Sequence, residues 1–124
     1  MRQALLNYYK YGVLGNAIRL EASSICQLRC PSCVHVCEGS KEFFRKVIGQ
    51  NYLRLKDFRK IIDDNPWIKC VELSNLGEIF LNPELREIIK YAHSKTVLLS
   101  AGTGVNLNAV SEEVMECLVK YNFQ

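Results

Sequence analysis

The pattern of apolar and polar residues predicts three successive pairs of a strand and a helix. Residues 17–22 (AIRLEA) alternate between apolar and polar side chains, as in a half-buried strand. Apolar residues then recur at helical spacing over residues 53–64, and Pro66 stops this helix. Residues 68–73 and 96–101 are the second and third expected strands.

Two further helices are marked by their capping residues. Asn82 followed by Pro83 predicts an N-cap with proline at the first helical position. The apolar stripe of this helix consists of Leu85, Ile88, Ile89 and Ala92. Ser111, followed by two glutamates, predicts the start of the last helix. Its expected inward side carries Val114, Cys117, Leu118 and Tyr121.

Strands that alternate with helices predict an α/β fold with a parallel sheet, whose crossovers are right-handed. Three such units fill residues 17–124, and residues 1–16 are expected to form a helical lead-in. No linker or internal repeat divides the chain. The apolar run 96–101 suits a strand that is buried on both faces and has a neighbour on its outer edge. We therefore expect these units to be the first half of a larger, truncated domain.

The composition excludes several classes of protein. The chain has 124 residues, of which 48% are hydrophobic and 23% charged, so disorder, collagen and coiled-coil architecture are excluded. A net charge of +3 is too small and too mixed to predict binding to nucleic acid or to a membrane surface. The basic residues between 41 and 60 share this stretch with Glu42 and Asp57 and are expected to form a solvated face. No apolar run approaches the roughly 18 residues of a membrane span, and no signal peptide is recognised, so a cytoplasmic location is expected.

The strongest chemical signal is a cluster of cysteines after the first strand. Four of the six cysteines lie within twelve residues, namely Cys26, Cys30, Cys33 and Cys37. In a reducing compartment such a cluster indicates metal binding more than disulfide formation. The C-x3-C-x2-C spacing of the first three allows one short loop to hold three irons of a cubane iron-sulfur cluster. The fourth iron would then remain open for a chelating ligand.

Polar segments also follow the second and third strands. They are residues 74–78 (SNLGE) and 100–104 (SAGTG). Because the carboxyl ends of parallel strands release their loops on the same side, we expect all three segments to converge on one rim. Glu78 would there be placed to hold the ammonium group of a ligand on the open iron.

These residues resemble the radical S-adenosylmethionine (radical SAM) enzymes. In that family three cysteines with this spacing bind a [4Fe-4S] cluster, and a Gly-Gly-Glu-Pro segment contacts the methionyl amino group of S-adenosylmethionine. The resemblance assigns the cluster to Cys26, Cys30 and Cys33, and the amino group to Gly77 and Glu78. The chain departs from the family pattern at Leu76 and Ile79, which flank the Gly-Glu pair, and at Ser32, where an aromatic residue is commoner.

The resemblance also implies a fold, a mechanism and partners. The family fold is a partial (βα)6 TIM-like barrel, of which residues 17–124 would be the first half. The implied reaction is reductive cleavage of S-adenosylmethionine to a 5′-deoxyadenosyl radical, with flavodoxin or ferredoxin as electron donor. The Cys-Pro-Ser-Cys sequence resembles that of family members that carry a C-terminal auxiliary-cluster (SPASM) domain. Because those members modify peptides or proteins, a peptide or protein is the expected substrate.

Other interpretations stay open for the same residues. The cysteines are also compatible with a zinc site completed by Cys37 or His35, and with an iron-sulfur or electron-transfer module that has no turnover of its own. Cys37 is expected to be a plain loop cysteine, with a fourth ligand as the alternative. Glu78 is alternatively an ordinary carboxylate near a helix N-terminus. Cys70 and Cys117 are expected to be small core residues.

Overall fold

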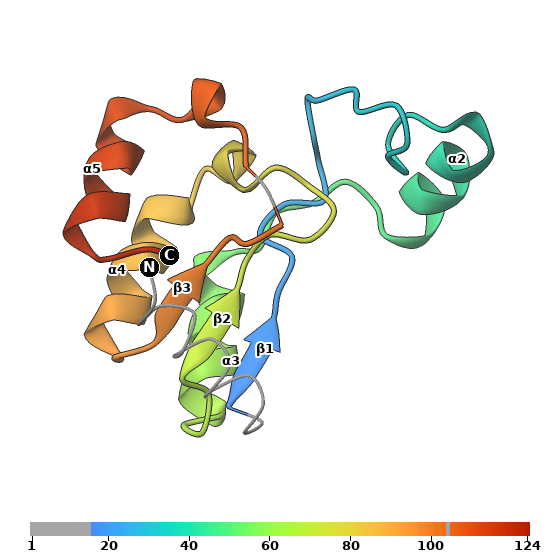
Figure 1. The fold of residues 1–124 in the computed structure, drawn as a ribbon. Coiled ribbons are helices and arrows are strands. Elements are labelled where there is room, and N and C mark those ends of the chain that lie inside the picture. Colours follow the sequence, from blue (N-terminus) through green and yellow to red (C-terminus); the bar gives the residue numbers. More distant parts are fainter. Residues whose placement is uncertain (1–15, 104) are drawn as a thin grey trace.

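The computed structural model describes residues 16–103 and 105–124, in which short strands alternate with helices (Figure 1). The strands are β1 (Ala17–Arg19), β2 (Cys70–Glu72) and β3 (Leu98–Ser100). The α-helices are α2 (Glu38–Val47), α3 (Leu55–Asp64), α4 (Leu85–Ser94) and α5 (Glu112–Lys120). Two 3₁₀ turns, η1 (Ile79–Leu81) and η2 (Leu107–Ala109), follow β2 and β3. The expected lead-in at residues 1–16 lies outside the described residues except for position 16.

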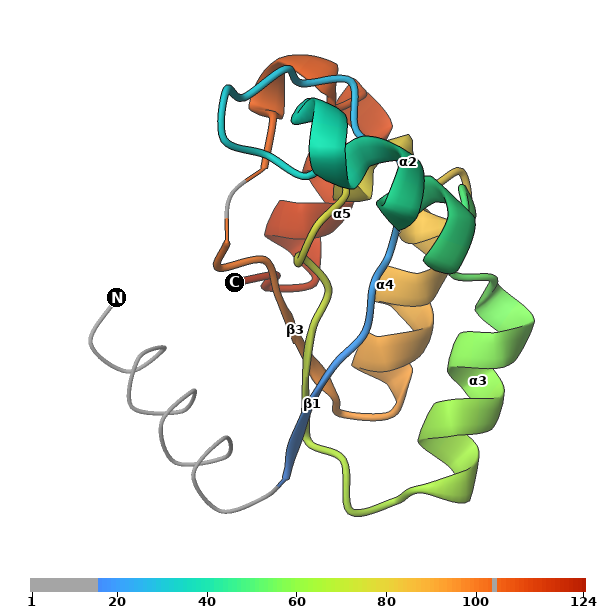
Figure 2. The same ribbon diagram turned by 90° about the vertical axis from the view of Figure 1, so that its right-hand side faces the viewer.

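The strands form an open parallel sheet in the order β1-β2-β3, which confirms the predicted α/β class. Ile18 pairs with Val71, and Val71 pairs with Leu99. Helices α3, α4 and α5 lie together on one side of this sheet (Figure 2). That arrangement follows from right-handed crossovers between strands that are added in sequence order.

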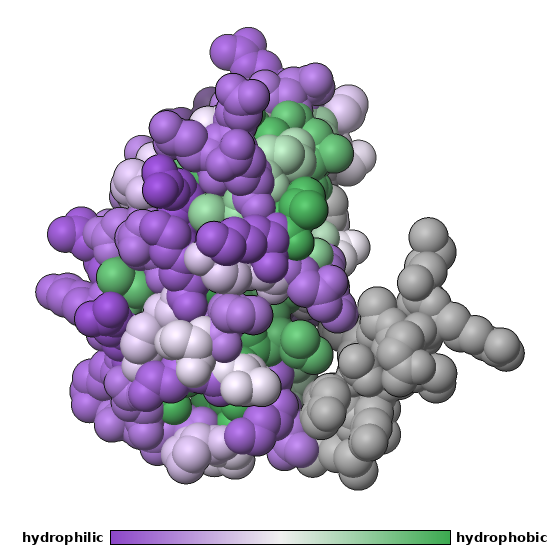
Figure 3. Space-filling view, turned by 90° about the vertical axis from the view of Figure 1, so that its left-hand side faces the viewer, coloured by the Kyte–Doolittle hydropathy of each residue, from purple (hydrophilic) through white to green (hydrophobic). Residues whose placement is uncertain are grey.

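The outer surface formed by these helices is mainly hydrophilic. Figure 3 shows the side on which α5 lies, where polar side chains dominate and apolar patches lie between them. Met115 and Val119 of α5 are among the exposed apolar residues of the chain. Within residues 16–103 and 105–124, no helix has the length and apolar character needed to cross a membrane.

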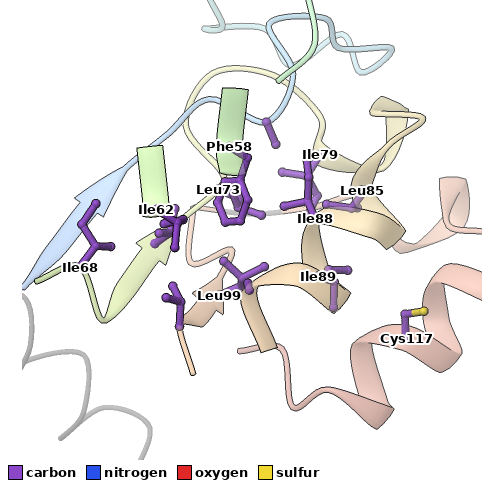
Figure 4. Packing of buried hydrophobic residues seen from close by; sticks show 14 residues of the cluster. Phe58, Ile62, Ile68, Leu73, Ile79, Leu85, Ile88, Ile89, Leu99 and Cys117 are labelled. Atoms are coloured by element: carbon purple, nitrogen blue, oxygen red, sulfur yellow. The ribbon is translucent and has the colours of Figure 1, made fainter. Parts of the chain in front are cut away.

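The core lies between the sheet and the three helices (Figure 4). Phe58 of α3 and Ile88 of α4 are fully buried and pack around Leu73, which follows β2. Burying side chains of this size stabilises the fold by about 1.5–3 kcal/mol each. Cys70 and Cys117 are buried among apolar residues, as the sequence predicted.

The end of the last helix adds a contact to the sheet. The Gln124 amide donates to the Leu99 carbonyl at 2.9 Å, and the Gln124 carbonyl accepts from the Ala101 amide at 2.8 Å. Two bonds that straddle Ser100 in this way are the pattern of a parallel neighbour. Residue 124 therefore occupies the outer edge of β3, where the sequence predicts a further neighbour.

Helix α5 begins as predicted, whereas α4 does not. The Ser111 hydroxyl accepts from the Val114 amide at 3.3 Å, which confirms this N-cap. Helix α4 starts at Leu85, so the prediction that Asn82 is its N-cap was wrong. The Asn82 side chain accepts from the Glu84 amide and donates to the carbonyls of Ala22 and Leu53. These distant partners hold Asn82 in a turn ahead of the helix.

Helix α2 was not predicted from the sequence. Its ten residues fall mostly in the stretch interpreted only as a solvated face. Phe44 is its single buried residue, and the His35 ring meets the Phe44 ring edge-on at 4.8 Å between centroids. The apolar residues Phe43, Phe44, Val47 and Ile48 do recur at helical spacing, a signal that the sequence analysis overlooked.

Candidate functional site

The cysteine loop, residues 25–37, leaves the carboxyl end of β1 and extends away from the sheet towards α2 (Figure 1). Cys26 and Cys33 are half-buried, whereas Cys30 and Cys37 are exposed. All four thiols are free, and so are Cys70 and Cys117. The loop therefore presents unpaired sulfur ligands at the end of the sheet where ligands of parallel βα folds bind.

Short backbone turns fold this loop on itself. The Cys33 amide donates to the Cys30 carbonyl at 3.0 Å, and the Cys37 amide donates to the Cys33 carbonyl at 3.0 Å. Cys37 is the N-cap residue of α2, and its thiol lies 3.5 Å from the Pro31 carbonyl oxygen. These turns thus determine how the cysteines are arranged in space, and α2 begins where the loop ends.

The pKa of Cys26 is raised. Burial is the main cause, one backbone hydrogen bond lowers the pKa, and repulsion from Glu78 and from the neighbouring sulfurs of Cys33 and Cys30 raises it further. Cys26 therefore holds its proton more firmly than an ordinary thiol. Because a metal binds the thiolate, any metal bound at Cys26 would have to displace this proton.

The segment after β2 lies directly against the start of the cysteine loop. A Cβ atom at Gly77 would come 1.7 Å from the Ser23 carbonyl oxygen, so only glycine fits between the two backbones. The Glu78 amide donates to the Ile25 carbonyl at 2.8 Å. These contacts place Gly77 and Glu78 beside Cys26.

Two side chains fasten the same segment on either side. The Glu21 carboxylate, just after β1, accepts from the amides of Leu76 and Gly77. His35 of the cysteine loop donates from Nε2 to the Leu76 carbonyl at 2.9 Å. His35 is half-buried between this carbonyl and the Phe44 ring of α2.

Glu78 is buried and joins the loops after β2 and β3. Its Oε1 accepts from the Phe80 amide at 3.3 Å, and its Oε2 accepts from the Asn106 amide at 2.8 Å. A carboxylate has about four lone-pair sites, so two amides leave acceptor capacity. Within the described residues, the Gly77 carbonyl oxygen accepts no hydrogen bond. This oxygen and Glu78 are the acceptors that this segment offers to an ammonium group.

A second buried carboxylate, Glu72 at the end of β2, was missed by the sequence analysis. It accepts from the Ser74 amide and hydroxyl, from the Ser100 hydroxyl at 2.6 Å and from the Gly102 amide at 2.8 Å. Burial raises the pKa of Glu72, but these hydrogen bonds outweigh it, so the pKa is lowered overall. The carboxylate therefore stays charged and fastens the loop after β3 to the end of β2.

The three segments predicted to meet do converge at the carboxyl end of the sheet. The cysteine loop contacts residues 76–78, and Thr103 donates to the Ser74 hydroxyl from both its amide and its hydroxyl. Gly104, the last residue of the third segment, lies outside the described residues. Convergence thus rests on backbone contacts and on two buried carboxylates.

The thiols suit an iron-sulfur cluster in their chemistry. Cys26, Cys30 and Cys33 are free, reach solvent and lie near enough for the Cys30 and Cys33 sulfurs to contribute to the raised pKa of Cys26. In the part of the chain that the structure describes, no three His, Cys, Asp or Glu side chains gather closely enough to hold one metal ion. The cysteines thus line an accessible loop and do not surround one point. Soft thiolates in such a loop are the usual ligands of iron-sulfur clusters.

The residues that sequence analysis missed share one property. Glu21, Glu72 and His35 act through backbone groups of distant loops, so no local motif marks them. Of these residues, Glu72 alone could have been recognised from the sequence, because a carboxylate within the apolar run 68–73 is unusual in a buried strand.

No protein-family model, curated protein or solved structure matches this chain. The functional interpretation therefore depends on the residues, contacts and charges at the carboxyl end of the sheet.

Proposed function

We propose that the chain is part of a radical S-adenosylmethionine enzyme. The contact between the cysteine loop and the Gly-Glu segment carries this proposal. The Glu78 amide bonds the Ile25 carbonyl, and Gly77 is pressed against Ser23, so a group held by Cys26 has Gly77 and Glu78 beside it. Cys33 and Gly77 are 44 residues apart in the sequence. If the cysteines and the Gly-Glu pair had separate functions, they would not need to lie together in the structure.

The residues of the chain have distinct tasks in this proposal. Cys26, Cys30 and Cys33 would hold a [4Fe-4S] cluster, and the Gly77 carbonyl and Glu78 would accept hydrogen bonds from the methionyl amino group. When bound, cluster and S-adenosylmethionine supply one-electron reductive cleavage to a 5′-deoxyadenosyl radical, which takes a hydrogen atom from the substrate. Glu21 and His35 keep the Gly-Glu segment against the loop, and Glu72 keeps the third loop in place.

The fold assigned by the proposal is the first half of a partial (βα)6 TIM-like barrel. Its support is the strand order β1-β2-β3 with α3, α4 and α5 on one side of the sheet, because barrels add their strands in sequence with all helices outside. The pairing of Gln124 with β3 adds to this support, since it shows that the outer edge of β3 accepts a parallel neighbour. An electron donor and a peptide or protein substrate in the cytoplasm belong to the same proposal.

One observation favours a second function, an iron-sulfur module without turnover. Both Glu78 oxygens already accept backbone amides, and Cys37 lies on the same loop as a fourth thiol. In that case Glu78 is a structural carboxylate, and four cysteines complete the cluster without an open iron.

Anaerobic reconstitution with iron and sulfide, followed by EPR of the reduced cluster, tests the proposal. We expect addition of S-adenosylmethionine to change the EPR signal, because the cofactor would chelate the open iron. Cys30→Ala is the matched negative control and should give little cluster. A wild-type signal that is indifferent to S-adenosylmethionine would favour the module without turnover.

A further inference from the structure

The two peptide groups on either side of Gly77 are held by partners from separate parts of the chain. In the first, the Leu76 carbonyl accepts from His35 Nε2 at 2.9 Å, and the Gly77 amide donates to Glu21 at 2.9 Å. Because the C=O and N–H of a trans peptide point in opposite directions, these partners hold the group from both ends. It therefore cannot rotate without breaking at least one of these hydrogen bonds.

The second peptide group is held at its amide end. Its N–H belongs to Glu78 and donates to the Ile25 carbonyl at 2.8 Å, and its C=O belongs to Gly77. The Gly77 carbonyl accordingly points away from the Ile25 oxygen. In the part of the chain that the structure describes, no group donates to it. This oxygen is thus a free acceptor whose direction is determined by the bonds around it.

Glu21 binds this segment from a rigid base. Its Oε1 accepts from the Leu76 amide at 3.2 Å and from the Gly77 amide at 2.9 Å, and its Oε2 lies 3.1 Å from the Leu76 nitrogen. Both neighbours of Glu21, Leu20 and Ala22, donate hydrogen bonds to the backbone at the end of β2. A side chain that is anchored in this way holds its partners more precisely than one on a free loop. Glu21 therefore fixes the segment relative to the sheet.

Other contacts also keep the segment against the start of the cysteine loop. Gly77 is packed on the Ser23 carbonyl, and the Glu78 amide is bonded to Ile25. Both contacts allow the preceding peptide group to rotate, because neither involves the Leu76 carbonyl or the Gly77 amide. The bonds to Glu21 and His35 remove this freedom. Their specific contribution is therefore the orientation of the segment.

We propose that Glu21 is a positioning residue that, with His35 at the other end of the same peptide group, aims the free Gly77 carbonyl at the amino group of the bound ligand. This inference rests on the proposed function, in which the ligand is S-adenosylmethionine. An ammonium group gains most from an acceptor that already points towards it, because binding then requires no rearrangement of the backbone. Glu21 acts through the peptide group and does not itself contact the ligand.

Hydrogen exchange of the cluster-free chain, measured by NMR, tests the orientation of the segment directly. Glu21→Gln leaves one acceptor oxygen for the amides of Leu76 and Gly77, so these amides should exchange about tenfold faster or more. The Glu78 amide, which is bonded to Ile25, should keep its wild-type exchange rate. Unchanged exchange at both Leu76 and Gly77 would overturn the inference, whatever the chain does with a cluster.

An EPR titration of the reconstituted chain with S-adenosylmethionine tests the effect on the ligand. Glu21→Gln should take up wild-type amounts of iron but need about tenfold more S-adenosylmethionine for half of the spectral change. Glu84→Gln is the matched control, because the Glu84 carboxylate also accepts a backbone amide, from Leu55 at the start of α3. This control should respond at the wild-type concentration. Equal shifts in both variants, or no shift in Glu21→Gln, would overturn the inference.

A double variant tests whether Glu21 and His35 act on the same peptide group. His35→Phe keeps a ring beside Phe44 and removes the Nε2 donor. Loss of either partner frees the group to turn, so loss of the second should add little. Glu21→Gln/His35→Phe should therefore need about as much S-adenosylmethionine as the weaker-binding single variant. Additive losses would show separate roles and contradict the inference.

The wild-type chain separates this inference from the proposed function. If its EPR signal ignores S-adenosylmethionine, the proposed function fails and the inference fails with it. If the wild-type signal responds and Glu21→Gln responds at the same concentration, the inference alone fails. The exchange of the Leu76 and Gly77 amides distinguishes these outcomes further, because it reports on the bonds to Glu21 without a cluster.

Discussion

Gly77 and Ser23 lie so close that a Cβ atom at position 77 would come 1.7 Å from the Ser23 carbonyl oxygen. The obstacle is backbone, so it cannot rotate away as a side chain would. Gly77→Ala should therefore push the segment after β2 away from the cysteine loop and lower the free energy of unfolding by about 2–3 kcal/mol. Urea denaturation followed by circular dichroism measures this loss.

Gly39→Ala is the control for this prediction. Gly39 lies in the first turn of α2, and no atom lies within 4 Å of an added Cβ. Alanine there should leave stability unchanged or raise it by up to about 1 kcal/mol, because it favours the helix. Equal effects of the two substitutions would show that close approach to Ser23 is not what position 77 requires.

The sequence predicted the parts of the structure that depend on local signals. The strand and helix order follows from periodicity, and the Ser111 cap follows from its neighbours. Convergence of the loops follows from parallel topology alone. Helix α2 was missed because its many charged residues favoured a solvated face, although apolar residues recur there at helical spacing. The role of Asn82 was missed because its partners, Ala22 and Leu53, are far away in the sequence.

The same limit applies to the candidate site. The cysteines and the Gly-Glu pair form short motifs that can be recognised without a structure. Glu72 and His35 bond to groups 28 to 41 residues away, so their contacts depend on how the loops fold together. What the sequence does not reveal is therefore which side chains hold the loops in place.

Glu72→Gln should lower the free energy of unfolding by about 2–3 kcal/mol at neutral pH. The carboxylate accepts from Ser74, Ser100 and Gly102, and a glutamine would turn an NH₂ group towards some of these donors. Urea denaturation measures the loss. Glu116→Gln, at an exposed position of α5, is the control and should change stability by less than about 0.5 kcal/mol.

The pH dependence of stability should differ between the wild type and Glu72→Gln. The pKa of Glu72 is lower in the folded chain than its ordinary value. Between these two pKa values the unfolded chain binds more protons, so the stabilisation is complete above about pH 4–5 and is lost as the pH falls through the folded pKa. The difference in unfolding free energy between wild type and variant should therefore shrink on acidification. A constant difference from pH 7 down to pH 3 would contradict the assignment.

Asn82→Ala should destabilise the fold by about 2–3 kcal/mol, because three hydrogen bonds of a buried side chain disappear. Asn82 donates to the Ala22 and Leu53 carbonyls at 2.8 and 2.9 Å and accepts from the Glu84 amide at 2.8 Å. The substitution leaves the two carbonyls without this donor. Thermal unfolding followed by circular dichroism should show a lower midpoint. Asn75→Ala, at an exposed loop position, should leave the midpoint nearly unchanged.

The cysteines should divide into three ligands and one bystander. Cys26→Ala, Cys30→Ala and Cys33→Ala should each lose most of the bound iron after anaerobic reconstitution, because each removes a thiolate from the cluster. Cys37→Ala should keep wild-type iron content, since Cys37 caps α2 and its thiol faces the Pro31 carbonyl. Iron and sulfide analysis with the visible absorption spectrum measures this. If Cys37→Ala loses iron as completely as Cys33→Ala, four cysteines hold the cluster, no iron is open for S-adenosylmethionine, and the module without turnover becomes the better interpretation.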